Sequence, residues 1–220
     1  MTAIKRLCLA EFSNEKYADE KYKDMVVFID CNPSFSIYTQ MALVSADKLV
    51  IPMMADFSSL EGLKGLFMLL YGKYPSAAVR QYARNRITFD SQAKSFGLQL
   101  PFIYEFVFNN FTSNSGVATA YDSIRTELLD FCYKQFTNYR GLFAVCSSTP
   151  TSFDEWASFY VSDIKDFHTA GKVSSSLGIP MFRLPNQSKY TMPDGTAVNL
   201  PVRNYPQALE NINTFVNKIR

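Results

Sequence analysis

The chain has 220 residues, of which 47% are hydrophobic and 15% aromatic, so it can bury the core of an α/β domain. Lys and Arg number 22 against 20 for Asp and Glu, and a net charge of +2 does not by itself predict a nucleic-acid partner. Four separated cysteines without a CxxC pair, together with a single histidine, argue against a zinc site or a disulfide framework.

The sequence carries no sign of a membrane protein or a secreted protein. No apolar run reaches the length of a membrane span, and the opening segment MTAIKRLCLAEFSNEKY becomes charged too early for a signal peptide. We therefore expect a cytoplasmic protein with reduced thiols. Because no repeat, low-complexity tract or linker interrupts the chain, residues 1–220 are expected to form a single α/β domain.

The first part of the chain predicts a βαβ unit. Residues 2–23 predict a leading helix, and residues 26–29 (VVFI) and 48–53 (KLVIPM) are apolar runs typical of strands covered on both faces. Residues 36–45 predict the helix that connects these strands, in a crossover that is almost always right-handed. A capping box formed by Ser58 and Glu61 predicts the start of the next helix, which Pro75 closes.

The second part continues the alternation of strands and helices, so the expected sheet is mainly parallel and flanked by helices. A Pro193-Asp194-Gly195 turn within residues 189–198 predicts a small hairpin or a loop tip. The further predicted strands are residues 102–108, 142–146 and 179–184, and the further predicted helices are residues 117–136, 152–167 and 206–219.

The stretch MVVFIDCNPSFS places Asp30 at the carboxyl end of the first predicted strand. Open α/β sheets bind ligands at that edge, and a carboxylate there can hold a magnesium-bound water at a nucleotide phosphate. The alternative is that Asp30 only caps the turn formed by Asn32-Pro33-Ser34.

Three motifs follow one another in the order D-C-N-P (residues 30–33), A-D-K-L-V-I-P (46–52) and S-L-E-G (59–62). In this order they resemble the ParA/MinD family of deviant-Walker ATPases, which partition plasmids and chromosomes or place division sites. The resemblance implies a P-loop NTPase-like fold of the SIMIBI class and ATP and Mg²⁺ as cofactors. It also implies a homodimer, nonspecific contact with DNA, and an adaptor protein of a partition system as a partner.

The resemblance also assigns roles to individual residues. Asp30 corresponds to the catalytic carboxylate that orients magnesium and water near the γ-phosphate, and Pro33 to the fixed turn after it. Pro52 ends the neighbouring strand beside the nucleotide, and residues 58–62 resemble the region near the ATP-dependent dimer interface. The segment FVFNNF resembles the strand whose final asparagine reads the adenine edge, which implies that role for Asn109; a turn-forming role is the alternative.

The phosphate-binding loop of the family has no counterpart in the sequence. The residues before Asp30 contain no glycine, and in the string Gly171-Lys172-Val173-Ser174 a valine separates the lysine from the hydroxyl. We therefore expect an N-terminally truncated relative that does not hydrolyse ATP at a useful rate unless a longer chain or another subunit supplies the loop.

A missing loop strand would leave an apolar sheet edge, for which we favour self-association over cover by the N-terminal segment or closing of the strands. The stripe of Leu63, Phe67 and Leu70 is either a second contact or ordinary core.

The segment KYPSAAVRQYARNRITF gathers Arg80, Arg84 and Arg86 with lysine and tyrosine side chains. This pattern predicts contact with nucleic-acid phosphates, and a solvated helical face is the alternative. His168 is expected near the carboxyl end of a helix. The sequence contains no G-x-S-x-G motif, so it does not indicate a serine hydrolase. Trp156 and Phe159 are expected in the core.

Three functional hypotheses remain open from the sequence. The first is a ParA-like partitioning ATPase whose nucleotide site is incomplete in this chain. The second is a non-hydrolysing relative that works as a dimerisation or binding module. The third is an unrelated α/β nucleotide-binding protein in which Asp30 has a different use.

Overall fold

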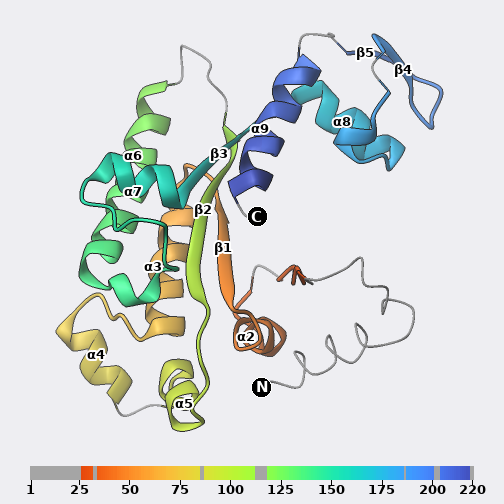
Figure 1. Cartoon of the computed structure of the whole chain (residues 1–220). Coiled ribbons are helices and arrows are strands. Elements are labelled where there is room, and N and C mark those ends of the chain that lie inside the picture. Colours follow the sequence, from red (N-terminus) through yellow and green to blue (C-terminus); the bar gives the residue numbers. More distant parts are fainter. Residues whose placement is uncertain are drawn as a thin grey trace, which may run out of the picture. The chain divides into compact units, whose positions relative to one another are not determined.

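The computed structural model describes residues 26–31, 34–84, 87–111, 118–185, 187–200 and 204–218. Three strands form a parallel sheet in the order β1-β2-β3, with helices beside it, and β4 and β5 form a separate antiparallel pair (Figure 1). This is the α/β architecture that the sequence predicts. The elements are α2 (Ile37–Leu43), β1 (Lys48–Met53), α3 (Phe57–Tyr71), α4 (Ala77–Arg84), α5 (Phe89–Ser95), β2 (Phe102–Phe111), α6 (Ala118–Asn138), η2 (Arg140–Leu142), α7 (Phe153–Tyr160), β3 (Val161–Lys165), α8 (His168–Leu177), η3 (Met181–Arg183), β4 (Lys189–Thr191), β5 (Ala197–Asn199) and α9 (Asn204–Lys218).

The described residues fall into two compact units. The first comprises the described residues up to Leu49 together with Leu60–Tyr104 and Gln135–Val145. The second comprises Val50–Ser59, Glu105–Lys134 and the described residues from Cys146 onward. Four of the five boundaries between the units fall inside β1, α3, β2 and α6, and the fifth lies between Val145 and Cys146, so the single domain expected from the sequence stays a prediction. No helix in the described ranges is long and apolar enough to cross a membrane.

Several predicted elements are confirmed. The predicted strand at residues 48–53 is β1 with the same bounds, and the strand predicted at 102–108 is β2, which continues to Phe111. Helices α2, α6 and α9 and the β4–β5 hairpin also lie where the sequence places them, with ends that differ by a few residues. The apolar periodicity of these segments is long or regular enough to identify them.

The predicted strand at residues 26–29 is wrong. These residues have no regular secondary structure, and the side chains of Val26 and Phe28 are 75% and 77% exposed. β-branched and aromatic residues favour a strand only when a neighbouring strand shares its hydrogen bonds, and none of the described strands pairs with this segment. The predicted helix at residues 2–23 lies outside the described residues.

The structure also corrects the second half of the prediction. Residues 152–167 do not form one helix, because α7 ends at Tyr160 and the next five residues form β3, parallel to β2. Residues 179–184 contain the short helix η3 in place of a strand. The strand predicted at 142–146 is reduced to one parallel bridge between Ile103 and Phe143, supported by the Ala144 N–H, which donates to the Ile103 carbonyl at 2.8 Å.

In the second unit, helices cover β2 and β3 on both faces. Phe106 and Phe108 are fully buried, and the Trp156 ring of α7 lies 6.3 Å from the Phe106 ring between centroids. Arg125 of α6 stacks over Phe108 at 4.2 Å and forms a bidentate pair with Asp163 at 2.8 and 3.0 Å. Helices α6 and α7 therefore cover one face, while α9 lies against the other (Figure 1).

In the first unit, α3 supplies the main apolar stripe. Leu63, Phe67 and Leu70 are 3%, 1% and 0% exposed, so the structure supports ordinary core packing for this stripe. At the end of the helix the Tyr71 hydroxyl donates to the Pro101 carbonyl at 2.8 Å, and burial raises the pKa of this phenol. Phe159, which the sequence places in the core beside buried Trp156, is only half-buried.

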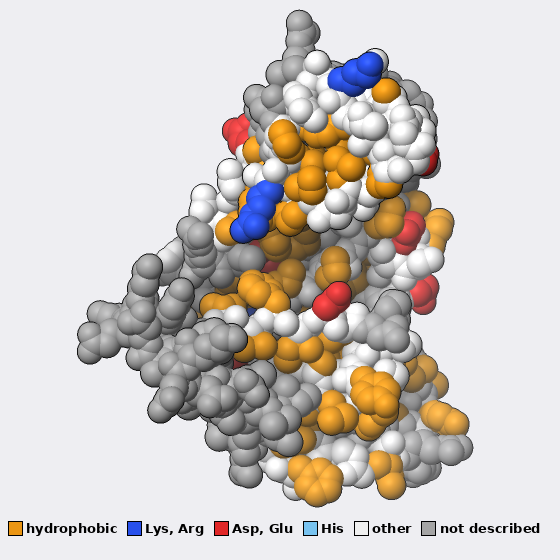
Figure 2. Space-filling view, turned by 90° about the vertical axis from the view of Figure 1, so that its right-hand side faces the viewer, with side chains coloured by type: hydrophobic (Ala, Val, Ile, Leu, Met, Phe, Trp, Pro, Cys, Tyr) orange, Lys and Arg blue, Asp and Glu red, His pale blue; other side chains and the backbone are white. Residues whose placement is uncertain are grey.

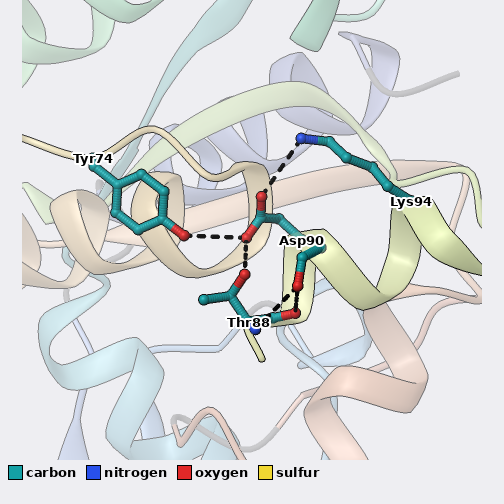
Figure 3. Close-up of polar contacts among 5 residues, drawn as sticks. Tyr74, Thr88, Asp90 and Lys94 are labelled. Carbon is teal, nitrogen blue, oxygen red and sulfur yellow. Dashed lines mark hydrogen bonds and ion pairs between the residues drawn. The ribbon is translucent and has the colours of Figure 1, made fainter. Parts of the chain in front are cut away.

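Asp90 ties α5 to the segment that follows α3 (Figure 3). Its Oδ1 accepts hydrogen bonds from the Thr88 hydroxyl at 2.7 Å and from the Tyr74 hydroxyl at 3.3 Å, and its Oδ2 lies 3.5 Å from the Lys94 amine. Asp90 as a residue is 7% exposed. The backbone of Gly72, at φ +63°, passes so close that an added Cβ would lie 2.3 Å from Asp90 Oδ2.

We predict that Gly72→Ala lowers the free energy of unfolding more than Gly97→Ala does. Gly97 has a matching φ of +61°, but nothing lies within 4 Å of its would-be Cβ, so that control carries the backbone strain alone. Gly72→Ala adds displacement of a hydrogen-bonded, buried carboxylate, and we expect an extra loss of about 1–3 kcal/mol. Urea unfolding of both variants measures the difference; equal losses would contradict the close contact with Asp90.

Candidate functional site

The carboxyl ends of β1, β2 and β3 meet at one edge of the sheet, where open α/β sheets bind ligands. The residues at this edge that are named below all belong to the second unit. Met54 and Asp56 follow β1, Asn109 lies near the end of β2, and Asp166 and His168 follow β3. This edge is the natural place to look for a binding site.

The turn from β1 into α3 is closed by its own side chains. Asp56 precedes the helix, and its Oδ1 accepts a hydrogen bond from the Ser59 N–H at 2.7 Å. The Ser59 hydroxyl in turn accepts one from the Met54 N–H at 3.0 Å. The capping box predicted for Ser58 and Glu61 is therefore misplaced, since Asp56 takes the capping role and Glu61 pairs with Lys64 at 2.7 Å.

At the end of β3, Asp166 fixes the conformation of His168. Its Oδ1 accepts a hydrogen bond from the His168 N–H at 2.8 Å, and its Oδ2 lies 2.8 Å from the imidazole Nδ1. His168 is the first residue of α8 and has a left-handed backbone with φ +44°, so its expected place at a helix carboxyl end is wrong. Asx-type bonding of this kind was not visible from residue spacing.

The residues that the family resemblance assigns to nucleotide are divided between the two units, so their assembly into one site stays a prediction. Asp30 is exposed, follows no strand and belongs to the first unit, whereas Pro52 and Asn109 are exposed on neighbouring strands of the second. The next residue, Cys31, has a raised pKa, first because of its partial burial and then because of the Asp30 charge. Pro33 lies outside the described residues.

The described residues do not fit the phosphates of a magnesium nucleotide. They contain no group of three or more His, Cys, Asp or Glu side chains that could hold a metal ion. Asp163 and Asp166 at the sheet edge are already paired with Arg125 and His168. Residues 171–174, the nearest string to a phosphate loop, lie inside α8 with Val173 buried. We therefore derive no hydrolytic step from this arrangement.

A cluster of positive charge lies in the first unit. Arg80 and Arg84 are exposed on α4, while Arg86 lies outside the described residues. The pKa of Lys73 is lowered, mostly by partial burial and then by the positive charges of Lys94 and Arg80. Sequence analysis did not include Lys94 in the positive cluster. Its spacing of four residues from Asp90 on one helix would have indicated the ion pair that places it there.

Lys73 is also held by an aromatic ring. Its Nζ lies 4.2 Å above the centroid of Tyr139, an arrangement in which the ring face attracts the ammonium group. Lys73, Arg80 and Lys94 come from three different segments, and the Asp90 carboxylate beside Lys94 opposes the lowering of the Lys73 pKa by the two positive charges.

Comparison with protein-family models gives one match, to an AAA domain, over residues 10–72. This span is less than a third of the chain and includes Asp30, Pro33, Pro52 and the S-L-E-G segment, but neither Asn109 nor the arginines of α4. The match indicates a P-loop NTPase-like domain and is consistent with the resemblance to ParA and MinD. Comparisons with curated proteins and with solved structures each found no match.

Proposed function

We propose that this protein acts in the partitioning of plasmids or chromosomes, or in related positioning, through a ParA/MinD-type domain. The observation that carries the proposal is the AAA-domain match over residues 10–72, which includes all three ordered motifs. Two of these motifs lie on β1 and α3, the strand and the helix that the resemblance requires there. A homodimer and an adaptor protein are part of this proposal, because the resemblance implies both.

The proposal includes a nucleotide site that is incomplete in these residues. ATP with Mg²⁺ would supply the phosphoryl chemistry of such a domain, and Asp30, Pro33, Pro52 and Asn109 are the residues proposed to face it. A glycine-rich loop of the K-G-G-x-G-K-[ST] kind occurs nowhere in the sequence. Without backbone amides and a lysine on the phosphates, the chain alone is a non-hydrolysing module.

A role in partitioning predicts that the replicon encoding this protein is lost more often when the protein is absent. Cells that carry an intact reading frame are compared with cells whose frame is interrupted after the Asp30 codon. We expect the interrupted frame to raise the frequency of replicon-free daughter cells several-fold, and complementation from a second site to reverse the loss. Equal loss frequencies in both strains would refute the partitioning role.

The incomplete site predicts that the chain does not bind ATP and magnesium detectably up to millimolar nucleotide. Isothermal titration calorimetry of the wild type and of Asp30→Ala measures this directly. We expect no heat of binding in either protein, because phosphate positioning is absent. Binding to the wild type that Asp30→Ala weakens would contradict the prediction and would show that Asp30 serves a functional nucleotide site.

Contact with DNA is a second candidate function, favoured by the cluster of Lys73, Arg80 and Lys94. Arg84, exposed on the same helix as Arg80, extends this cluster with a second guanidinium group. A patch of this kind binds phosphates without reading bases, so its affinity depends on salt and little on sequence. The proposal therefore concerns nonspecific binding to duplex DNA.

We predict that Arg80→Ala/Arg84→Ala weakens binding to a labelled random-sequence duplex and lowers the slope of log affinity against log salt by roughly 2, about 1 for each lost phosphate contact. Fluorescence anisotropy over a series of salt concentrations gives both quantities. Arg183→Ala, an exposed arginine of the other unit, is the matched control and should leave the slope unchanged. An unchanged slope in the double variant would exclude α4 as the contact.

A further inference from the structure

Glu105 is a charged residue in the interior of the second unit. It lies in the central strand β2 and is only 1% exposed. An ionised carboxylate in such a place is costly unless an opposite charge and hydrogen bonds compensate for lost water. One of its oxygens, Oε2, is buried and has no hydrogen-bond partner among the described residues. The carboxylate therefore depends on the partners of its other oxygen.

Those partners come from β3 and from the end of α9. The Ser162 hydroxyl donates to Glu105 Oε1, and the Lys218 amine lies 3.3 Å from the same oxygen. Lys218 also donates to the Val161 carbonyl at 2.5 Å and lies 3.4 Å from the Ser162 hydroxyl. Lys218 thus balances the charge of Glu105 and attaches the last described turn of α9 to the sheet.

The other half of α9 is held by a different force. Leu209 and Ile212 pack against a separate hydrophobic cluster, here called the hairpin cluster. In the part of the surface that holds α8 and the hairpin, hydrophobic side chains lie among polar ones (Figure 2). The hairpin cluster consists of Ala170, Val173, Met181, Leu184, Tyr190 and Leu200.

The two attachments of α9 therefore rest on different interactions, apolar burial at one point and a charge pair at the other. At 1.5 Å per residue, Leu209 and Lys218 are separated by about 14 Å along the helix axis. Burial of apolar area holds the first point, which a change of charge leaves intact. The second point depends on a charge pair, and removing one member of a buried pair leaves the other uncompensated. A change at Lys218 acts on one end of the helix only.

We propose that Glu105 and Lys218 form an electrostatic latch that fastens the carboxyl-terminal end of α9 to β2 and β3. When Lys218 loses its charge, this end is released while Leu209 and Ile212 keep α9 attached to the hairpin cluster. The side chain of Lys218 is 25% exposed against 1% for Glu105, so the lysine is the member of the pair that solvent and partners can reach. This inference does not depend on the proposed function.

Hydrogen–deuterium exchange of the whole chain, followed by mass spectrometry, tests the latch. We expect Lys218→Met to speed exchange in residues 213–218 on the order of tenfold, while α6 and the β4–β5 hairpin exchange as in the wild type. Lys172→Met removes an exposed lysine of α8 and serves as the matched control, with no expected change in α9. Unchanged exchange in residues 213–218 of Lys218→Met would overturn the latch.

A double variant separates release of the latch from general loss of stability. Glu105→Gln/Lys218→Met removes both charges and keeps the amide able to accept from Ser162, so we expect slower exchange in residues 213–218 than in Lys218→Met alone. If the double variant exchanges as fast as the single one, the charges are not coupled and the proposal fails. Faster exchange throughout the chain in Lys218→Met would likewise overturn it. The double variant leaves no uncompensated charge, so it also serves if Lys218→Met does not fold. In that case we expect residues 213–218 to exchange faster in the double variant than in the wild type, and unchanged exchange there would overturn the latch.

Discussion

The burial of β2 on both faces constrains the rest of the second unit. Successive side chains of a strand point to opposite faces, so Phe106 and Phe108 need cover on one face and Glu105 needs it on the other. Helices α6 and α7 meet the first requirement with Trp156 and Arg125. Helix α9 meets the second with Lys218, because an apolar cover alone would leave a charge buried without compensation.

Charged side chains at the carboxyl edge of the sheet are likewise paired with groups of the same fold. Asp163 neutralises Arg125, Asp166 fixes His168, and Asp56 caps α3, so the described carboxylates of this edge already have structural roles. The AAA-domain match over residues 10–72 is consistent with a ParA/MinD-type domain, and the three carboxylates are already engaged in contacts within the fold.

Sequence reasoning succeeded where hydrophobic spacing alone decides the element. β1, β2 and α3 contain continuous or regularly spaced apolar residues, and their positions follow from that pattern. It failed where contact with another part of the fold determines the secondary structure. Residues 26–29 look like a buried strand yet are exposed, and residues 161–165 look helical yet pair with β2. The capping of α3 by Asp56 and the pairing of Glu105 with Lys218 likewise depend on tertiary contacts that no local pattern encodes.

Proline in β1 has a consequence for the outer border of the sheet. Among the described strands, β1 lies at the edge in the order β1-β2-β3, and its residue Pro52 has no N–H to donate to an additional strand. Prolines in sheets are found where the missing donor faces away from the neighbouring strand, so an incoming strand would meet a gap in its hydrogen-bond ladder here. Pro52 thus interrupts the hydrogen-bond ladder that Leu49, Val50 and Ile51 would offer to another chain, and Lys48 adds a charge to the same strand, so both features disfavour fibril-like aggregation along this border.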